Sequence, residues 1–261
     1  MASTKEGGRV RRRRVALLVG IVDYKDETLE SLESVAMDVA LMKDALSSHW
    51  NADDNFEVIE RVMRLADEYT APDLLNDIES ALEGASHFLF FFAGHGIPGS
   101  FGLQLATPEK ESSLDSGVFF DSILHRINGC DVDEVTIILD CCNSGQGGDP
   151  GIAGAFRWTQ LREGVTVLAS CEANEMSWAD QGDAGRFTKK LVERLNDRDS
   201  SPVTVLDLFT HAAAAQLWGQ TPVLRTFGSM FSPLRAETQM AAFVHDDKRA
   251  ESRHSRATPS S

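Results

Sequence analysis

Short apolar runs that alternate with helix-like segments constrain the fold of this sequence most strongly. The most apolar run is FLFFFA (88–93), which is followed directly by Gly94. Runs this short, rich in branched and aromatic residues, are typical of strands buried on both faces. The expected strands are 15–20, 56–63, 88–93, 135–139, 165–169 and 222–227. Strands that alternate with helices predict an α/β domain, a three-layer sandwich with a mostly parallel six-stranded sheet.

The segments between these runs carry helical periodicity and helix-start signals. Residues 29–46 place Leu32, Val35, Val39, Met42 and Leu46 on one face. Thr70 with Asp73 three residues later predicts a capped helix start, and Thr204 with Asp207 predicts another. The expected buried faces are Leu75, Ile78 and Leu82 after Thr70, Phe187, Leu191 and Leu195 after Gly185, and Leu206, Phe209, Ala213 and Leu217 after Thr204. A short helix over 121–128 is expected with Asp121 as its cap.

The 261 residues divide by composition into three parts. Residues 1–14 form a basic arm, 15–235 are predicted to form the folded domain, and 236–261 form a polar tail whose composition is typical of disorder. The first apolar run, VALLVG, is shorter than the roughly 7–15 residues that a secretory signal needs, so a cytoplasmic protein is expected. A net charge of −15 repels nucleic acid and anionic membrane, so neither is expected as a partner.

The four cysteines are too few and too irregularly spaced for a disulfide framework. No CxxC or HxxxH spacing suggests a zinc site. The sequence therefore predicts neither a metal nor another cofactor.

Two segments place reactive side chains just past the ends of expected strands. His95 follows FLFFFA in FFAGHG, and Asp140, Cys141 and Cys142 follow VTIIL in ILDCCNSG. Because ligands of parallel sheets bind outside the carboxyl ends of the strands, an imidazole and a thiol are expected at one edge. A thiolate nucleophile with an imidazole base is the chemistry of cysteine peptidases. Spacing alone leaves the choice between Cys141 and Cys142 open.

The backbone N–H groups of Gly96 and Cys142 are candidate donors to the oxyanion of the intermediate. A residue without a side chain at position 96 lets the backbone approach a substrate carbonyl closely. The expected reaction is hydrolysis of a protein or peptide substrate.

The Gly-His-Gly segment and the segment DCCNSG together resemble the two catalytic blocks of the caspase–metacaspase clan (peptidase family C14), especially its prokaryotic caspase-like and metacaspase branch. VALLVGIVDY, VTVLASC, GRFT and QTP at 220–222 add to the resemblance, which spans about residues 15–228. The resemblance implies the caspase–hemoglobinase fold, with His95 as base and Cys142, at the third position of Asp-x-Cys, as nucleophile. In this family a backbone carbonyl often orients the histidine.

Two acidic residues bear on substrate specificity. A partly buried Asp140, two positions before Cys142, would favour a cationic P1 side chain, and the resemblance implies Asp38 as a second contributor. Cleavage after Arg or Lys is therefore expected. Arg157 and Arg162 are candidate processing sites in the loop after Cys142. The resemblance further implies an upstream activator protease or a sensor protein as a partner, whereas the segment after His95 lacks the aspartate cluster of calcium-dependent relatives, so no calcium requirement is expected.

Two rival interpretations remain. GHGIPG (94–99) formally satisfies the dinucleotide fingerprint G-x-G-x-x-G, but that motif must follow the first strand and open a helix. A catalytically silent caspase-like binding or scaffold module is the other alternative. Retention of both His95 and Cys142 argues against it.

Overall fold

A six-stranded sheet with the order β10-β8-β7-β3-β1-β2 forms the centre of the molecule. The structure is a computed structural model that describes residues 13–99, 102–109, 117–141, 161–172, 182–198, 202–217, 219–227 and 230–236. All neighbouring strands pair in parallel except β10, which runs antiparallel to β8. The six strands coincide with the six expected runs: β1 (Arg14–Ile21), β2 (Glu57–Met63), β3 (His87–Gly94), β7 (Glu134–Cys141), β8 (Val165–Ala169) and β10 (Val223–Phe227).

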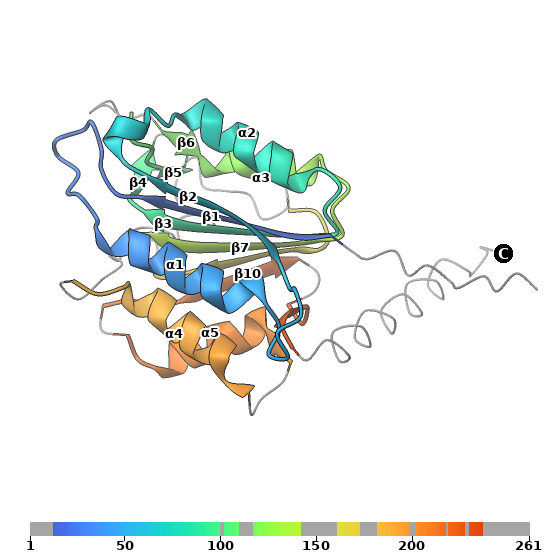
Figure 1. The fold of residues 1–261 in the computed structure, drawn as a ribbon. Helices are drawn as coiled ribbons and strands as arrows, with labels where there is room; N and C mark the ends of the chain where they lie inside the picture. Colours follow the sequence, from blue (N-terminus) through green and yellow to red (C-terminus); the bar gives the residue numbers. More distant parts are fainter. Residues whose placement is uncertain are drawn as a thin grey trace, which may run out of the picture.

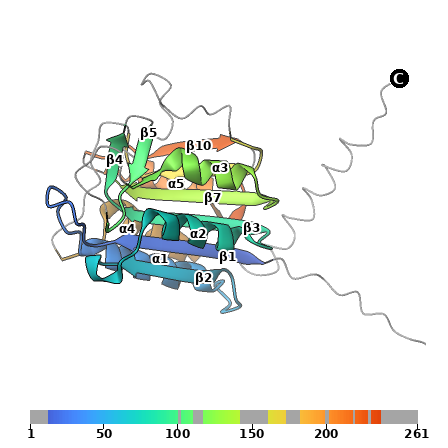
Figure 2. The same ribbon diagram turned by 90° about the horizontal axis from the view of Figure 1, so that it is seen from above.

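Helices cover both faces of this sheet, as Figure 1 shows. One face carries α2 (Ala71–Leu82) and α3 (Phe120–Asn128), and the other carries α1 (Ser34–Ser47), α4 (Arg186–Asn196) and α5 (Val205–Ala214). In the view from above (Figure 2), α2 and α3 lie over the strands. The predicted three-layer α/β sandwich with a mostly parallel six-stranded sheet is confirmed.

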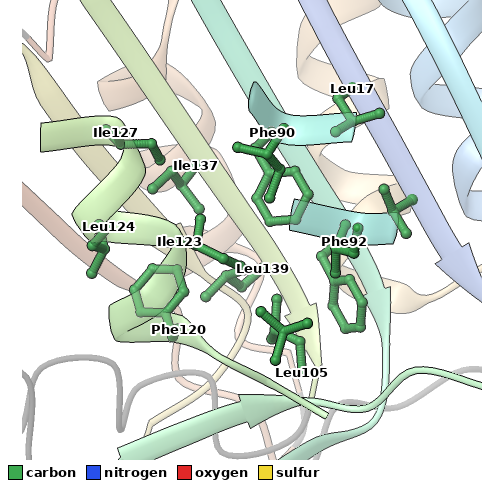
Figure 3. Packing of buried hydrophobic residues seen from close by; sticks show 14 of the residues in the cluster. Leu17, Phe90, Phe92, Leu105, Phe120, Ile123, Leu124, Ile127, Ile137 and Leu139 are labelled. Carbon is green, nitrogen blue, oxygen red and sulfur yellow. The ribbon is translucent and has the colours of Figure 1, made fainter. Parts of the chain in front are cut away.

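The central strand β3 explains why the sheet has two separate cores. All eight of its residues are buried, and alternate side chains enter opposite clusters. Phe88, Phe90 and Phe92 pack toward α2 and α3, while Leu89 and Phe91 pack toward α1 and α4. Figure 3 shows Phe90 and Phe92 among side chains from α3 and the neighbouring strands. Full burial of each such side chain contributes roughly 1.5–3 kcal/mol, which makes β3 a stable support for the residue that follows it.

The chain after β3 turns into a small antiparallel sheet of β4 (Gly96–Gly99), β5 (Gly102–Leu105) and β6 (Val118–Phe119). GHGIPG thus runs from the end of β3 into β4 and opens no helix, so the structural context of a dinucleotide site is missing. The remaining short elements are η1 (Leu65–Asp67), β9 (Val203–Thr204) and β11 (Pro233–Arg235).

Helix starts follow the predicted capping chemistry at two of three positions. Thr70 and Thr204 each form a complete capping box with the aspartate three residues later. The third prediction is wrong, because Phe119 rather than Asp121 is the N-cap of α3. Burial of the Phe120 side chain draws that residue into the helix, so Asp121 lies in the first turn, where a carboxylate still favours the helix dipole.

The predicted inward face of α5 is also wrong, by one residue. Val205, Leu208 and Ala212 are its buried side chains, while Phe209 is only partly buried and Ala213 is exposed. Because VLDLFTHAAA is apolar on most sides, its periodicity does not single out one face. Packing against α4, β8 and β10 decides which side is buried.

Helix α1 packs unusually close to β1 at Gly20. A Cβ at this position would lie 2.9 Å from Val39 Cγ2 and 3.1 Å from the Val35 carbonyl oxygen, both on α1. Contacts below 3.0 Å force a neighbour to move, so glycine permits this close approach. The packing fixes the depth of the helical turn that carries Asp38.

Arg14, a partly buried arginine at the start of β1, joins this strand to β11, the last described strand. The Arg14 guanidinium lies over the Phe56 ring at 4.1 Å from its centroid. It donates to Asn55 Oδ1 and, at 2.6 Å, to the Pro233 carbonyl in β11.

In the described part of the chain, none of the helices combines the length and apolarity that crossing a bilayer requires.

Candidate active site

The register of β3 and β7 brings the two predicted catalytic segments to one edge of the sheet. Gly94 is paired with Cys141 at the carboxyl ends of these neighbouring parallel strands. His95 follows Gly94 and Cys142 follows Cys141, each by one peptide bond. His95 is among the described residues; Cys142 lies outside them.

The His95 ring is held in one orientation by a backbone carbonyl. Its Nε2 lies 2.9 Å from the carbonyl oxygen of Glu30, in the segment between β1 and α1. Because a carbonyl only accepts, Nε2 carries the proton and Nδ1 is left as the basic nitrogen of the neutral ring. Burial lowers the pKa of His95 below its usual value, although the Glu30 carbonyl opposes this shift. At neutral pH the imidazole is therefore uncharged and able to take a proton.

Tyr24 supports the backbone of His95 through a hydrogen bond. The Tyr24 hydroxyl accepts a hydrogen bond from His95 N–H at 3.0 Å and donates to the Ile21 carbonyl at 3.0 Å. The two rings are tilted by 54° with their centroids 4.9 Å apart. On the other side, the His95 carbonyl accepts from Ala106 N–H at 3.0 Å. His95 is thus fixed at its backbone and at its ring.

Cys141 is a core residue. Its side chain is fully buried in the cluster beneath α2 and α3. Its carbonyl oxygen lies 3.4 Å from both Ser170 Oγ and Cys171 Sγ, which donate to it. Since side chains alternate along a strand, Asp140 points to the opposite face, toward α1 and α4.

Asp140 and Asp38 meet on that face. Their side chains are only 6% and 3% exposed. Asp38 Oδ1 accepts a hydrogen bond from Gly185 N–H at 2.7 Å, and Asp140 Oδ2 accepts one from Thr188 Oγ1 at 2.7 Å. A Cβ on Gly185 would lie 2.9 Å from Asp140 Oδ2 and 3.3 Å from both Asp38 oxygens, so the two carboxyl groups approach within about 6 Å.

This closeness changes the protonation of the pair. Burial, followed by the charge of Asp140, raises the pKa of Asp38 to about 8. Two carboxylates that share a buried site cannot both ionise easily, which is the physical cause of this raised pKa. The N-terminus of α4, at Gly185, adds a partial positive charge beside the pair.

The remaining predicted site residues are Gly96, Arg157 and Arg162. Gly96 is buried at the start of β4, next to His95. Arg157 lies outside the described residues. Arg162 is engaged by the backbone: its Nε donates to the Ile127 carbonyl at 2.9 Å and its Nη2 to the Val132 carbonyl.

Sequence reasoning did not identify four supporting groups: the Glu30 carbonyl, Tyr24, Gly185 and Thr188. Tyr24 lies in VALLVGIVDY, and Gly185 and Thr188 are the first and last residues of GRFT, so the motifs contained them without revealing their contacts. A backbone carbonyl has no sequence signature, which is why Glu30 could not be found. Among the described residues, no group of three or more His, Cys, Asp and Glu side chains is arranged to hold a metal ion.

Comparison with known proteins agrees with this architecture. The profile of a family described as "Caspase domain" matches residues 13–218. Caspase-1 from Spodoptera frugiperda superposes with a TM-score of 0.65 at 14% identity, covering 87% of this chain and 91% of its own. A protein from Geobacter sulfurreducens superposes with a TM-score of 0.60 at 14% identity, covering 83% and 94% respectively. Curated protein sequences give no significant match. The extent of the profile match and the caspase fold together place this chain in the caspase-domain family of cysteine peptidases.

Proposed function

We propose that this protein is a cysteine endopeptidase that cleaves proteins after Arg or Lys, with Cys142 as nucleophile and His95 as general base. The observation that supports the proposal is the pairing of Gly94 with Cys141 at the ends of adjacent parallel strands, because His95 and Cys142 are the next residues in the sequence. Cys141, buried in the core, is poorly suited to attack a substrate, which favours Cys142.

The chemistry follows from the state of His95. Its neutral Nδ1 takes the Cys142 thiol proton, and the thiolate attacks the scissile carbonyl. The resulting imidazolium gives the proton to the leaving amine as the C–N bond breaks, leaving a thioester that water hydrolyses. Hydrogen bonding of Nε2 to the Glu30 carbonyl stabilises the charged ring in both steps. The Gly96 and Cys142 N–H groups are the proposed oxyanion donors.

Specificity for a basic P1 side chain is supported by the Asp38–Asp140 pair. Two acidic groups within about 6 Å of each other attract one cation more strongly than either would alone. An acidic P1 side chain would instead be repelled there.

Processing in the loop after Cys142 is expected at Arg157 rather than at Arg162. Cleavage after Arg162 would require its guanidinium to leave the Ile127 and Val132 carbonyls and enter an active site. Those carbonyls, at the end of α3 and before β7, would lose a charged donor, at a cost of roughly 1.5–3 kcal/mol for each such hydrogen bond. Mass spectrometry of the purified protein, with and without an Arg157→Gln change, locates the cut.

The function is tested with fluorogenic peptides that differ only at P1, carrying Arg, Lys, Asp or norleucine. The wild type should cleave the Arg and Lys peptides and leave the Asp peptide intact. Cys142→Ala should abolish cleavage, while Cys141→Ala, the matched control at the adjacent cysteine, should cost stability but retain turnover. Cleavage of the Asp peptide would contradict the specificity, and activity of Cys142→Ala would contradict the nucleophile.

An arginyl chloromethyl ketone separates an enzyme from a silent module of the same fold. The folded wild type should gain one adduct, located on Cys142 by peptide mapping. A folded protein that gains no adduct would support the scaffold alternative.

A further inference from the structure

The Asp38–Asp140 pair is buried and held in a fixed arrangement by hydrogen bonds. Each carboxyl group has a defined donor, Gly185 N–H for Asp38 and Thr188 Oγ1 for Asp140, and both side chains are almost fully buried. The elements that converge here are α1, the carboxyl end of β7 and the start of α4, and Figure 1 shows α1 and α4 together on one face of the sheet. A rigid frame therefore holds two acids close together with little water to separate their charges.

The charged neighbours of Asp38 do not relieve this crowding. Asp140 faces it from β7, and Asp183 and Lys189 act on it from the start of α4. The Lys189 ammonium forms an ion pair with Asp183 at 2.7 Å, which offsets much of its effect on the pair. The net effect of these neighbours leaves the pKa of Asp38 raised.

We propose that Asp38 and Asp140 share one proton in the free enzyme, and that the cationic P1 side chain of a substrate expels this proton to solvent when it binds. This inference rests on the proposed function and adds to it the proton balance of substrate recognition. The cation supplies the charge that the proton supplied before, so the buried site changes occupant without gaining an unpaired negative charge. Asp38 carries this proton, because burial and the neighbouring Asp140 carboxyl group both oppose its ionisation.

The consequence is a pH-dependent affinity. The pKa of Asp38 is raised to about 8. A P1 cation that binds below this pH must therefore displace the proton from the Asp38 carboxyl group. Affinity for an Arg peptide should then rise about 25-fold from pH 6.5 to pH 8.5 and level off above it. The pKa of His95 is lowered while that of Asp38 is raised, so the two groups titrate in different pH ranges.

The test measures protons directly. An Arg-P1 peptide amide is titrated into the Cys142→Ala protein by calorimetry at pH 7.0 in phosphate and in Tris, whose ionisation enthalpies differ. The difference should correspond to about 0.9 proton released per peptide bound at pH 7.0, falling to about 0.1 at pH 9.0. Asp38→Asn in the same background should bind without proton release, and exposed Asp44→Asn on the same helix, the matched control, should behave like the parent.

Three outcomes decide the matter. Release near one proton that disappears in Asp38→Asn supports the proposal. Tight binding of the Arg peptide with less than 0.2 proton released overturns it and leaves the proposed function intact. If the Arg peptide binds no better than its norleucine-P1 analogue at any pH, the basic specificity fails and this inference fails with it.

Discussion

Replacing Tyr24 by Phe isolates the support beneath the proposed general base. The change deletes one oxygen atom, which accepts from His95 N–H and donates to the Ile21 carbonyl, both at 3.0 Å. It leaves both backbone groups without this partner in a site where the tyrosine is 8% exposed. An unsatisfied buried group costs about 1–3 kcal/mol, so unfolding in urea should show a loss of about 2 kcal/mol.

The activity of Tyr24→Phe should fall as well. His95 keeps the Glu30 carbonyl at its ring and Ala106 at its carbonyl, so it shifts rather than detaches. A small displacement of a catalytic group is sufficient for a tenfold loss in kcat/KM, equivalent to about 1.4 kcal/mol. A looser, better hydrated ring should also have a higher pKa, which moves the acidic limb of the pH profile upward.

Tyr69→Phe is the matched control, because Tyr69 is equally buried and its hydroxyl bonds to Asp77 rather than to His95. Its hydroxyl donates to Asp77 Oδ2 at 2.8 Å, and Arg61 holds the same carboxylate through two further hydrogen bonds. This variant should lose about 1–2 kcal/mol of stability with unchanged kcat/KM. Equal stability losses with no difference in kcat/KM or in the acidic limb would refute the view that Tyr24 positions His95.

Three further predictions test other parts of the structure. Because burial lowers the pKa of His95, the acidic limb of kcat/KM should lie below pH 6.5, with activity falling as the ring becomes protonated; a limb above pH 7 would contradict this. Gly185→Ala should raise KM for an Arg peptide about tenfold, since its Cβ would crowd Asp140 Oδ2 at 2.9 Å, whereas Gly129→Ala, whose nearest contact is 3.5 Å, should leave kinetics unchanged. Arg14→Met should destabilise the fold by about 3 kcal/mol without altering kcat/KM, because Asn55 and the Pro233 carbonyl lose a charged donor far from the site; equal stability in denaturant titrations would show that these bonds contribute little.

The sheet could be predicted from the sequence because its strands are short, apolar and separated by segments with helical periodicity. FLFFFA could only be a buried strand, and the chemistry of His95 and of the cysteines pointed to the ends of such strands. Helix faces were less certain where apolar residues surround the axis, as in α5. There the buried side depends on packing against α4, β8 and β10, which periodicity alone does not reveal.

The contacts that support the site could not be predicted from the sequence, because they join residues that are far apart along the chain. The Glu30 carbonyl is 65 residues from His95, and only the fold brings them together. Asp38 became a candidate through family resemblance alone, since one aspartate on a helix resembles any solvated residue. Its burial, and its contact with a glycine 147 residues away, are properties of packing between α1 and α4.

The narrow gap at Gly20 links a residue near the end of β1 to the proposed specificity of the protein. Val35 and Val39 flank Asp38 on the same stretch of α1, so an added methyl group on β1 would lift that stretch by a few tenths of an ångström. The 2.7 Å hydrogen bond that Asp38 Oδ1 accepts from Gly185 N–H would be distorted by such a shift. A substitution at Gly20 is therefore expected to change the proposed selectivity for charged substrates, although Gly20 itself contacts no substrate.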